Sequence, residues 1–198
     1  KNLKEKKFDL SDHGKTKNFI LNCKPDYIFH LAAQAIVSKS YTHPLETWKS
    51  NFFSFLNILD TLRYVKKTTT VVMITSDKCY LNVEKKTGYK EDERLGGFEN
   101  YSASKASCEI LFKSYFKSFF EKQNTIKLAT GRAGNVIGGG DWSQDRLIPD
   151  CFKKWMKNQK VIIRNPNSTR PWQNIIDVII GYTTLASKLL KNRKLHGE

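Results

Sequence analysis

Short apolar runs alternate along this chain with longer stretches of helical periodicity, and this alternation is the feature that most constrains the fold. Three runs have the length of buried strands, at residues 27–32, 71–75 and 126–130. Nearly continuous apolar runs of this length are typical of parallel strands covered on both faces. Between them, residues 47–64 and 104–120 place apolar side chains every three or four positions, as amphipathic helices do. The order predicts an α/β fold, a doubly wound parallel sheet built from right-handed βαβ units.

The character of the chain changes after three consecutive glycines at residues 138–140, which we interpret as a flexible connector. Beyond them we expect a helix over 148–158, a short strand over 161–163 and a last amphipathic helix over 175–190. We therefore predict one sheet domain over residues 1–140. Residues 141–198 would form part of a smaller C-terminal domain that closes over a cleft.

Composition excludes several classes of function. The net charge of +15 could indicate a nucleic-acid partner, but the lysines are scattered in pairs and no zinc-finger, zipper or RNA-binding signature occurs. No apolar run approaches the roughly 20 residues that span a bilayer. The four cysteines lack the spacing of a metal site or a disulfide framework. We expect no nucleic-acid partner, no membrane partner, no metal and a cytoplasmic protein, whose basic cleft would attract a substrate carrying a diphosphate.

The clearest chemical signal is Tyr101 followed by Lys105 at the start of a predicted helix. Four residues make about one helical turn, so the two side chains lie on the same face. An ammonium near a phenol favours the phenolate and lowers its pKa, which produces a base for a sugar hydroxyl. Taken alone, the pair could equally be a surface tyrosine beside a solvated lysine.

Small, polar or ionisable residues follow each of the three predicted strands. Residues 32–34 follow the first strand, 76–78 the second and 131–138 the third. In a parallel sheet, ligands bind beyond the carboxyl ends of the strands. These three segments therefore predict a site at that edge, with His30 expected as a packed strand residue instead of a ligand.

Together these blocks carry a family resemblance. His30-Leu31-Ala32-Ala33-Gln34, Thr75-Ser76-Asp77-Lys78-Cys79-Tyr80, Tyr101-x-x-x-Lys105 and Arg132-x-x-Asn135 resemble the signatures of the extended short-chain dehydrogenase/reductase family of NAD-dependent epimerases and dehydratases. The versions Ser-Asp-Lys-Cys-Tyr, Gly-Asn-Val-Ile-Gly-Gly-Gly-Asp-Trp and Arg-Leu-Ile-Pro-Asp are similar to those of 4,6-dehydratases that act on CDP-glucose. The resemblance runs from about Asp9 to the end of the chain. It implies a Rossmann-like NAD-binding domain that lacks its N-terminal strands, a nucleotide-sugar substrate and a homodimer.

The same resemblance implies roles for individual residues. Tyr101 would take the proton of the sugar 4-hydroxyl, Ser76 would hydrogen-bond that hydroxyl, and Lys105 would hold the nicotinamide ribose. Asp77 and Lys78 would serve as acid and base for the loss of water across C5 and C6, although the family's usual base is glutamate and the role of Lys78 stays open. The implied NAD contacts are Asp9, Leu10, Leu31, Ala32, Ala33, Gln34, Thr75, Tyr101 and Lys105. The implied substrate contacts are Asn135, Leu147 and Arg170.

The chain departs from the family pattern at both ends. No G-x-x-G-x-x-G occurs, and residues 195–198 stand where a strand of the substrate domain should begin. We therefore expect a fragment of a longer hydro-lyase, inactive by itself because half of the dinucleotide crevice is missing. A dTDP- or GDP-hexose dehydratase, a nucleotide-sugar epimerase and a non-catalytic binding fragment remain as alternatives. The triplet at 76–78 favours a dehydratase over an epimerase.

Overall fold

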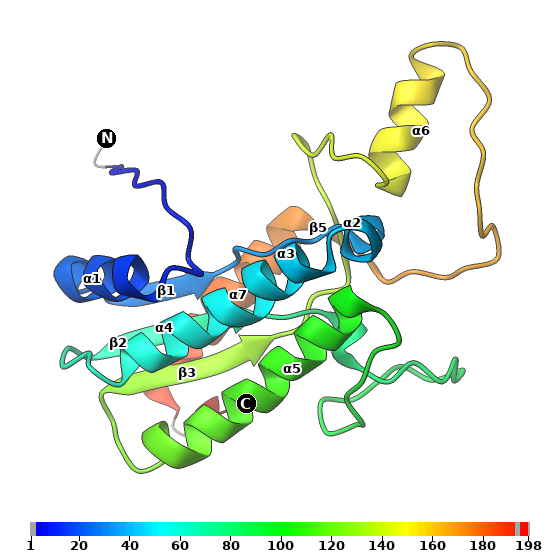
Figure 1. The fold of residues 1–198 in the computed structure, drawn as a ribbon. Coiled ribbons are helices and arrows are strands. Elements are labelled where there is room, and N and C mark those ends of the chain that lie inside the picture. The colour runs from blue at the N-terminus through cyan, green and yellow to red at the C-terminus, as the bar shows by residue number, and fades with distance from the viewer. Residues whose placement is uncertain (1–2, 193–194, 198) are drawn as a thin grey trace.

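The computed structural model describes residues 3–192 and 195–197 and is built around a parallel sheet (Figure 1). The strands are β1 (Tyr27–His30), β2 (Thr69–Ile74) and β3 (Ile126–Gly131), in the order β1-β2-β3. Each coincides with a predicted apolar run to within two residues at either end. Both neighbouring pairs are parallel, with Phe29 opposite Val72 and Val72 opposite Ala129. The predicted parallel α/β fold is confirmed.

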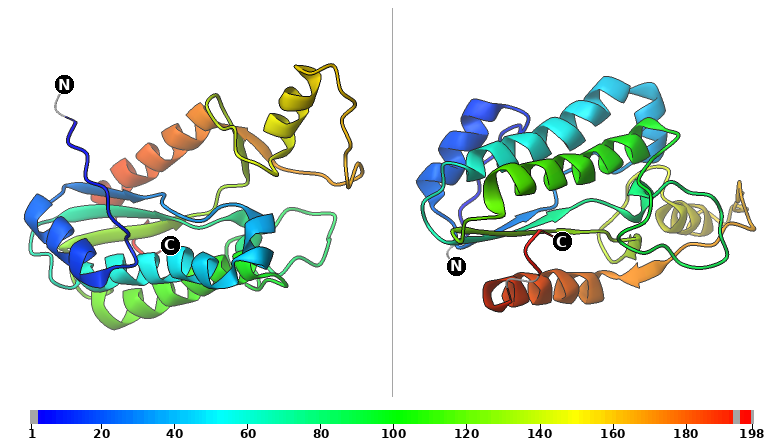
Figure 2. Two further views of the ribbon diagram at one scale, coloured as in Figure 1. Left: turned by 45° about the horizontal axis from the view of Figure 1, so that its top comes forward. Right: turned by 90° about the horizontal axis from the view of Figure 1, so that it is seen from below.

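Helices cover both faces of this sheet (Figure 2). One face carries α1 (His13–Cys23), α4 (Ser54–Leu62) and α5 (Asn100–Tyr115), with the short α2 (Val37–Thr42) and α3 (Pro44–Trp48) before α4. Single π-helical stretches, η1 (Lys49–Phe53) and η3 (Phe116–Phe120), precede α4 and follow α5. The main core joins Phe55 and Leu59 of α4, Phe112 of α5 and Leu128 of β3. The amphipathic stretches 47–64 and 104–120 are thus helical, as predicted.

The last helix, α7 (Ile175–Lys191), covers the opposite face of the sheet. Its Ala186 and Leu189 are buried against Val72 and Ala129. We expected this helix within the smaller domain over 141–198, whereas it packs on β2 and β3. The physical reason is that these strands are apolar on both faces, so the second face also has to be removed from water.

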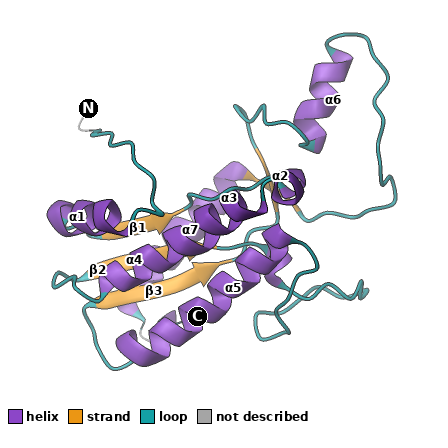
Figure 3. Cartoon of the chain, in the orientation of Figure 1, coloured by secondary structure: helices purple, strands orange, loops and turns teal. Residues whose placement is uncertain are grey.

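The intervening segment is packed differently. Strands β4 (Asn135–Ile137) and β5 (Trp172–Asn174) form a parallel pair, and between them α6 (Leu147–Trp155) is joined to the body by long loops (Figure 3). The helix predicted over 148–158 is present but ends at Trp155. Residues 161–163 form no strand, because no neighbouring strand pairs with their backbone. Residues 195–197 form a turn, and Glu198 lies outside the described residues. A domain division at residue 141 stays a prediction.

Within the described ranges, no helix combines the length and the apolar character needed to cross a membrane.

Candidate active site

The carboxyl end of β2 leads directly into the predicted catalytic triplet. Ser76 is the N-cap of a short 3₁₀ helix, η2 (Asp77–Cys79), and its Oγ accepts the Lys78 N–H at 3.2 Å. The same hydroxyl donates to Asp77 Oδ1 at 3.0 Å. The Asp77 N–H donates to the Ala133 carbonyl at 3.1 Å, which ties this turn to the segment after β3. Ser76, Asp77 and Lys78 are therefore held at one edge of the sheet, as expected.

Helix α5 brings Tyr101 and Lys105 to this edge. Its N-cap, Glu99, accepts the backbone N–H groups of Tyr101 at 2.6 Å and Ser102 at 2.8 Å. Tyr101 is only 8% exposed, and its phenol lies close enough to the Ser76 side chain for that polar group to influence its pKa. Lys105, one turn later, is 5% exposed and directs its Nζ to the Ile74 carbonyl at 3.4 Å. The structure thus joins Tyr101, Lys105 and the Ser76 turn.

The electrostatics of the phenol differ from the expectation. Burial raises the pKa of Tyr101, and although the polar Ser76 side chain and the positive charge of Arg146 act in the opposite direction, the net shift is upward. Burial also lowers the pKa of Lys105. The expectation that the Lys105 ammonium makes Tyr101 acidic is therefore wrong for this structure. Desolvation of the phenolate exceeds the attractive contributions around it.

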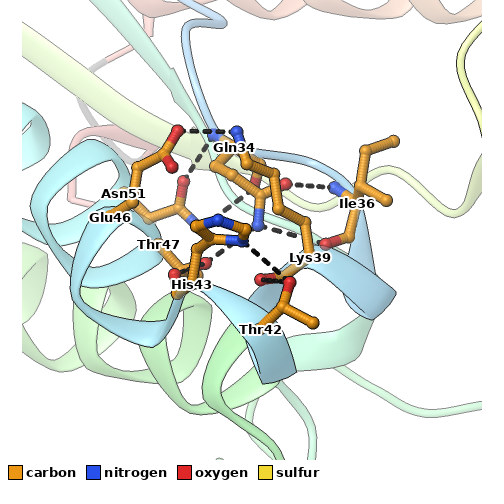
Figure 4. A network of polar contacts seen from close by, with 8 residues as sticks. All are labelled: Gln34, Ile36, Lys39, Thr42, His43, Glu46, Thr47 and Asn51. Carbon is orange, nitrogen blue, oxygen red and sulfur yellow. Dashed lines mark hydrogen bonds and ion pairs between the residues drawn. The ribbon is translucent and has the colours of Figure 1, made fainter.

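The loop after β1 is shaped by a polar network (Figure 4). Leu31 and Ala32 are exposed, but Gln34 is buried and its Nε2 donates to the Thr47 hydroxyl at 2.9 Å and to the Ile36 carbonyl at 3.1 Å. The Gln34 N–H donates to Asn51 Oδ1 at 2.8 Å, and Asn51 Nδ2 donates back to the Gln34 carbonyl at 3.1 Å. The Gln34 side chain therefore organises this loop, and its predicted contact with NAD stays a prediction.

Asn51 is a site-shaping residue that the sequence interpretation did not single out. Besides its bonds to Gln34, its Nδ2 donates at 2.9 Å to the hydroxyl of Ser104, which lies between Tyr101 and Lys105 on α5. It couples the loop after β1 to the helix that carries the phenol. The available signal was an amide on the apolar face of an amphipathic stretch, since a buried amide requires partners.

Asp9 and Leu10 lie before α1, at the amino-terminal side of the described chain. The Asp9 carboxylate accepts the Ser11 N–H at 2.9 Å, and this backbone hydrogen bond, with Lys49 at 3.4 Å, lowers the Asp9 pKa. The Leu10 carbonyl accepts from the Asn57 amide of α4 at 2.9 Å. Both residues are thus anchored to the helices beside β1, and their adenine contact stays a prediction.

A cavity of about 1770 Å³ opens beside the turn at 76–78. Its lining includes four of the predicted site residues, Asp77, Lys78, Asn135 and Arg170. Leu147 is not part of this lining; it begins α6 and is 44% exposed. Arg170 is exposed, with its Nη1 donating to the Thr169 carbonyl at 2.7 Å. The structure thus brings the turn at 76–78 and two predicted substrate contacts, Asn135 and Arg170, to one cavity. The third predicted substrate contact, Leu147, lies outside it.

The part of the chain that the structure describes contains no candidate set of metal ligands. No three His, Cys, Asp or Glu side chains come together there in a group that could hold an ion.

With this geometry established, sequence comparison gives the family. A family model described as GDP-mannose 4,6 dehydratase matches residues 1–193. The chain belongs to this family. It is 45% identical over 185 residues to CDP-glucose 4,6-dehydratase of Salmonella typhimurium, covering 91% of this chain and 52% of that protein. The resemblance inferred from the motifs is confirmed, and the chain spans about half the length of this relative.

Solved structures agree on the fold. An epimerase of Methanothermobacter thermautotrophicus superposes with a TM-score of 0.84 at 24% identity, over 100% of this chain and 57% of that one. A dTDP-glucose 4,6-dehydratase of Streptomyces venezuelae, solved with NAD bound, has a TM-score of 0.78 at 18% identity and covers 90% of this chain and 52% of its own. At these identities the likeness establishes the Rossmann-like architecture.

Proposed function

We propose that the complete protein is an NAD-dependent nucleotide-sugar 4,6-dehydratase whose substrate is CDP-glucose. The observation that carries the proposal is the buried Tyr101 phenol against Ser76, with Lys105 one turn away and Asp77 and Lys78 facing the adjoining cavity. This combines a proton acceptor for a sugar alcohol with an acid/base pair for elimination. The similarity to the Salmonella enzyme named above supports CDP-glucose as the nucleotide sugar.

The residues at the carboxyl ends of β1 and β2 fit a dinucleotide. Lys105 is a buried ammonium with three donors, and its bond to the Ile74 carbonyl is long at 3.4 Å, so it has donor capacity for ribose hydroxyl oxygens. Leu31 and Ala32, which follow β1, offer exposed apolar surface at the carboxyl end of that strand. The chemistry that bound NAD supplies is reversible hydride acceptance, with the hydride taken from C4 of the sugar and returned to C6.

The first step assigned to this chain is removal of the 4-hydroxyl proton. Tyr101 accepts this proton, and the Ser76 hydroxyl orients the phenol oxygen and the oxygen of the sugar 4-hydroxyl. Because burial raises the pKa of Tyr101, the phenol of the unliganded protein holds its proton at neutral pH. Tyr101 would act as the base in the filled site, where the positively charged oxidised nicotinamide would favour its phenolate.

Elimination follows from the adjacent pair at 77–78. A 4-keto group makes the C5 proton acidic. Lys78, as the neutral amine, takes this proton, and Asp77, as the neutral acid, gives one to the 6-hydroxyl, which leaves as water. Once hydride has returned to C6, C5 regains a proton from Lys78 and the 4-ketone remains in the product. The proton that Tyr101 took from the 4-hydroxyl then passes to solvent, and Asp77 regains one from solvent, which closes the cycle.

The remaining assignments concern the diphosphate and the nucleoside. Asn135 and Arg170 line the cavity and would hold the diphosphate, since guanidinium groups form paired hydrogen bonds to phosphate oxygens. Leu147 would pack on the base or ribose if α6 moves toward the cavity.

Isotope transfer tests the reaction. CDP-glucose deuterated at C4 is incubated with the complete protein and NAD, and the product is analysed by mass spectrometry and NMR. We expect a 4-keto-6-deoxy product lighter by one water, with deuterium at C6. A product that keeps its 6-hydroxyl, or an inverted C4, would overturn the proposal in favour of an epimerase. Parallel reactions with dTDP-glucose and GDP-mannose test the nucleotide, and preferred turnover of either would replace CDP-glucose.

We also propose that the complete protein pairs through the outer faces of α4 and α5. These helices lie side by side on one face of the sheet (Figure 2). They and their π-helical extensions expose the large apolar side chains Phe53, Ile110 and Phe119, and Tyr64 is exposed in the turn after α4. Ile110→Glu should convert a dimer into a monomer in analytical ultracentrifugation, whereas Ile180→Glu on α7 should not.

The cysteines support a reducing compartment. All four are free, and burial raises the pKa of Cys79 and of Cys108 to about 12, so both stay protonated and unreactive. We accordingly place the protein in the cytoplasm, where free thiols persist.

A further inference from the structure

A largely buried ion pair lies at the candidate site, and both of its residues contribute to the lining of the cavity. Glu109 follows Lys105 by one turn on α5, and its side chain is 1% exposed. Its Oε2 lies 2.8 Å from Nη2 of Arg132, whose side chain is 10% exposed. A buried ion pair often contributes less to the stability of a protein than apolar residues of similar size would at the same positions. Stability alone is therefore a weak explanation for the pair.

Glu109 connects α5 to the ends of two strands. Its Oε1 accepts a hydrogen bond from the Thr75 hydroxyl, immediately before Ser76. Its Oε2 accepts from the Thr130 hydroxyl near the end of β3 at 3.3 Å, in addition to Arg132. The helix that carries Tyr101 is thus bonded to the residue that precedes the catalytic turn.

Arg132 holds the other end of the same turn. Its Nη1 donates to the Tyr80 hydroxyl at 3.0 Å and to the Glu91 carbonyl at 2.9 Å. The guanidinium carbon also lies 4.9 Å from the centre of the Tyr80 ring. Although burial opposes the charge, the bonds to Glu109 and Tyr80 raise the pKa of Arg132 above its ordinary value, so Arg132 is charged at neutral pH.

We propose that the Glu109–Arg132 pair positions the segment from Thr75 to Tyr80 against α5 and so sets the approach of Ser76 to Tyr101. The inference rests on the proposed function and adds two positioning residues to it. Glu109 bonds Thr75 at the start of the segment, and Arg132 bonds Tyr80 at its end. The three catalytic candidates Ser76, Asp77 and Lys78 lie between these anchors. Directional bonds at both ends are what an apolar pair of the same volume would lack.

Measuring kcat together with Tm distinguishes a positioning role of the Glu109–Arg132 pair from a purely stabilising one. The variants are Glu109→Gln, Arg132→Lys and the double variant Glu109→Leu/Arg132→Met, with Glu121→Gln in the exposed Lys117–Glu121 pair as the matched control. Glu109→Gln leaves a buried charge without its partner and should lower Tm, and the double variant should recover Tm. Because small misplacement of reacting groups is costly, kcat should fall about 10- to 100-fold in all three, with KM within about threefold. Recovery of kcat together with Tm in the double variant would overturn the proposal.

Arg132→Lys refines this test. A lysine keeps the positive charge near Glu109, but its single nitrogen cannot bond Glu109 and Tyr80 in the same fork geometry. We expect Tm close to that of the unmodified protein with kcat still reduced. Full kcat with lysine would show that charge alone suffices and would contradict the positioning role.

A second readout does not depend on turnover. The titration of Tyr101 is followed by NMR in protein labelled with ¹³C at tyrosine Cζ, and its signal is assigned with Tyr101→Phe. Moving the Ser76 side chain away from the phenol should raise the pKa of Tyr101 in Glu109→Gln, whereas removing a negative charge alone would lower it. A lowered or unchanged Tyr101 titration would refute the inference. If the unmodified protein leaves CDP-glucose unchanged, the proposed function fails and this titration still decides the inference.

Discussion

The sheet with α4 and α5 and the segment over 139–171 contain similar apolar side chains in opposite circumstances. Leu59 and Phe112 are fully buried against the sheet, whereas Phe152 and Trp155 of α6 are 50% and 57% exposed. The predicted catalytic residues belong to the first region, and Leu147 and Arg170 belong to the second. The difference indicates that close packing against the sheet fixes the positions of the predicted catalytic residues. We propose that recognition of the nucleotide falls to the second segment, whose apolar side chains are exposed.

The largest expected effect comes from the phenol in the packed region. Tyr101→Phe removes the proton acceptor and should reduce kcat of the complete protein by about 10³-fold, within the range of general acid–base catalysis. Tm should change little, since the ring stays buried. Tyr115→Phe, on the same helix but away from Ser76, is the control and should keep full activity. Comparable activity in both variants would remove Tyr101 from the mechanism.

Core truncation tests the comparison directly. Phe112→Ala should reduce the free energy of unfolding by about 3–5 kcal/mol, because it leaves a large cavity in a close-packed core. Trp155→Ala should change it by less than about 1 kcal/mol, since this side chain is more than half exposed. Denaturant titrations of both variants measure the difference. Equal losses would show that α6 is packed as tightly as α5.

Acid stability provides a third test within the core. Burial lowers the pKa of His30 to about 4 in the folded protein, from an unfolded value of about 6.5. Between these values the unfolded state binds more protons, so stability is lost as pH falls from 6.5 toward 4, by roughly 2–3 kcal/mol.

Unfolding of the unmodified protein and of His30→Gln at about pH 7.5 and pH 4.5 isolates this contribution. The variant should lose that much less stability on acidification. His13→Gln, at a partly exposed histidine paired with Asp60, is the comparison, and an identical pH dependence for His30→Gln and the unmodified protein would contradict the assignment.

The smallest effect is expected in the loosely packed segment. Arg170→Ala should raise KM for CDP-glucose about tenfold with kcat within about twofold, because a phosphate contact contributes mainly to binding. Arg164→Ala, also exposed but outside the lining of the cavity, should leave both constants unchanged. A larger fall in kcat than in affinity would assign Arg170 to the packed, reacting region and weaken the comparison.

Local patterns determined much of this protein. The apolar runs placed all three strands of the central sheet, because a strand covered on both faces must be apolar throughout. The spacing of Tyr101 and Lys105 placed both side chains on one face of α5, since four residues make about one turn. The polar strand ends identified the edge at which Ser76, Asp77 and Lys78 lie.

Tertiary structure decided what depends on residues distant in sequence. It directed Gln34 toward Thr47, seated α7 on the sheet and paired Glu109 with Arg132 at the site. It also reversed the expected shift of the Tyr101 pKa. The spacing of Tyr101 and Lys105 predicts that the two side chains are close, but it does not predict that the phenol is removed from water, which raises its pKa. Periodicity is a local property of the chain, whereas burial and charge pairing arise only when separate segments meet.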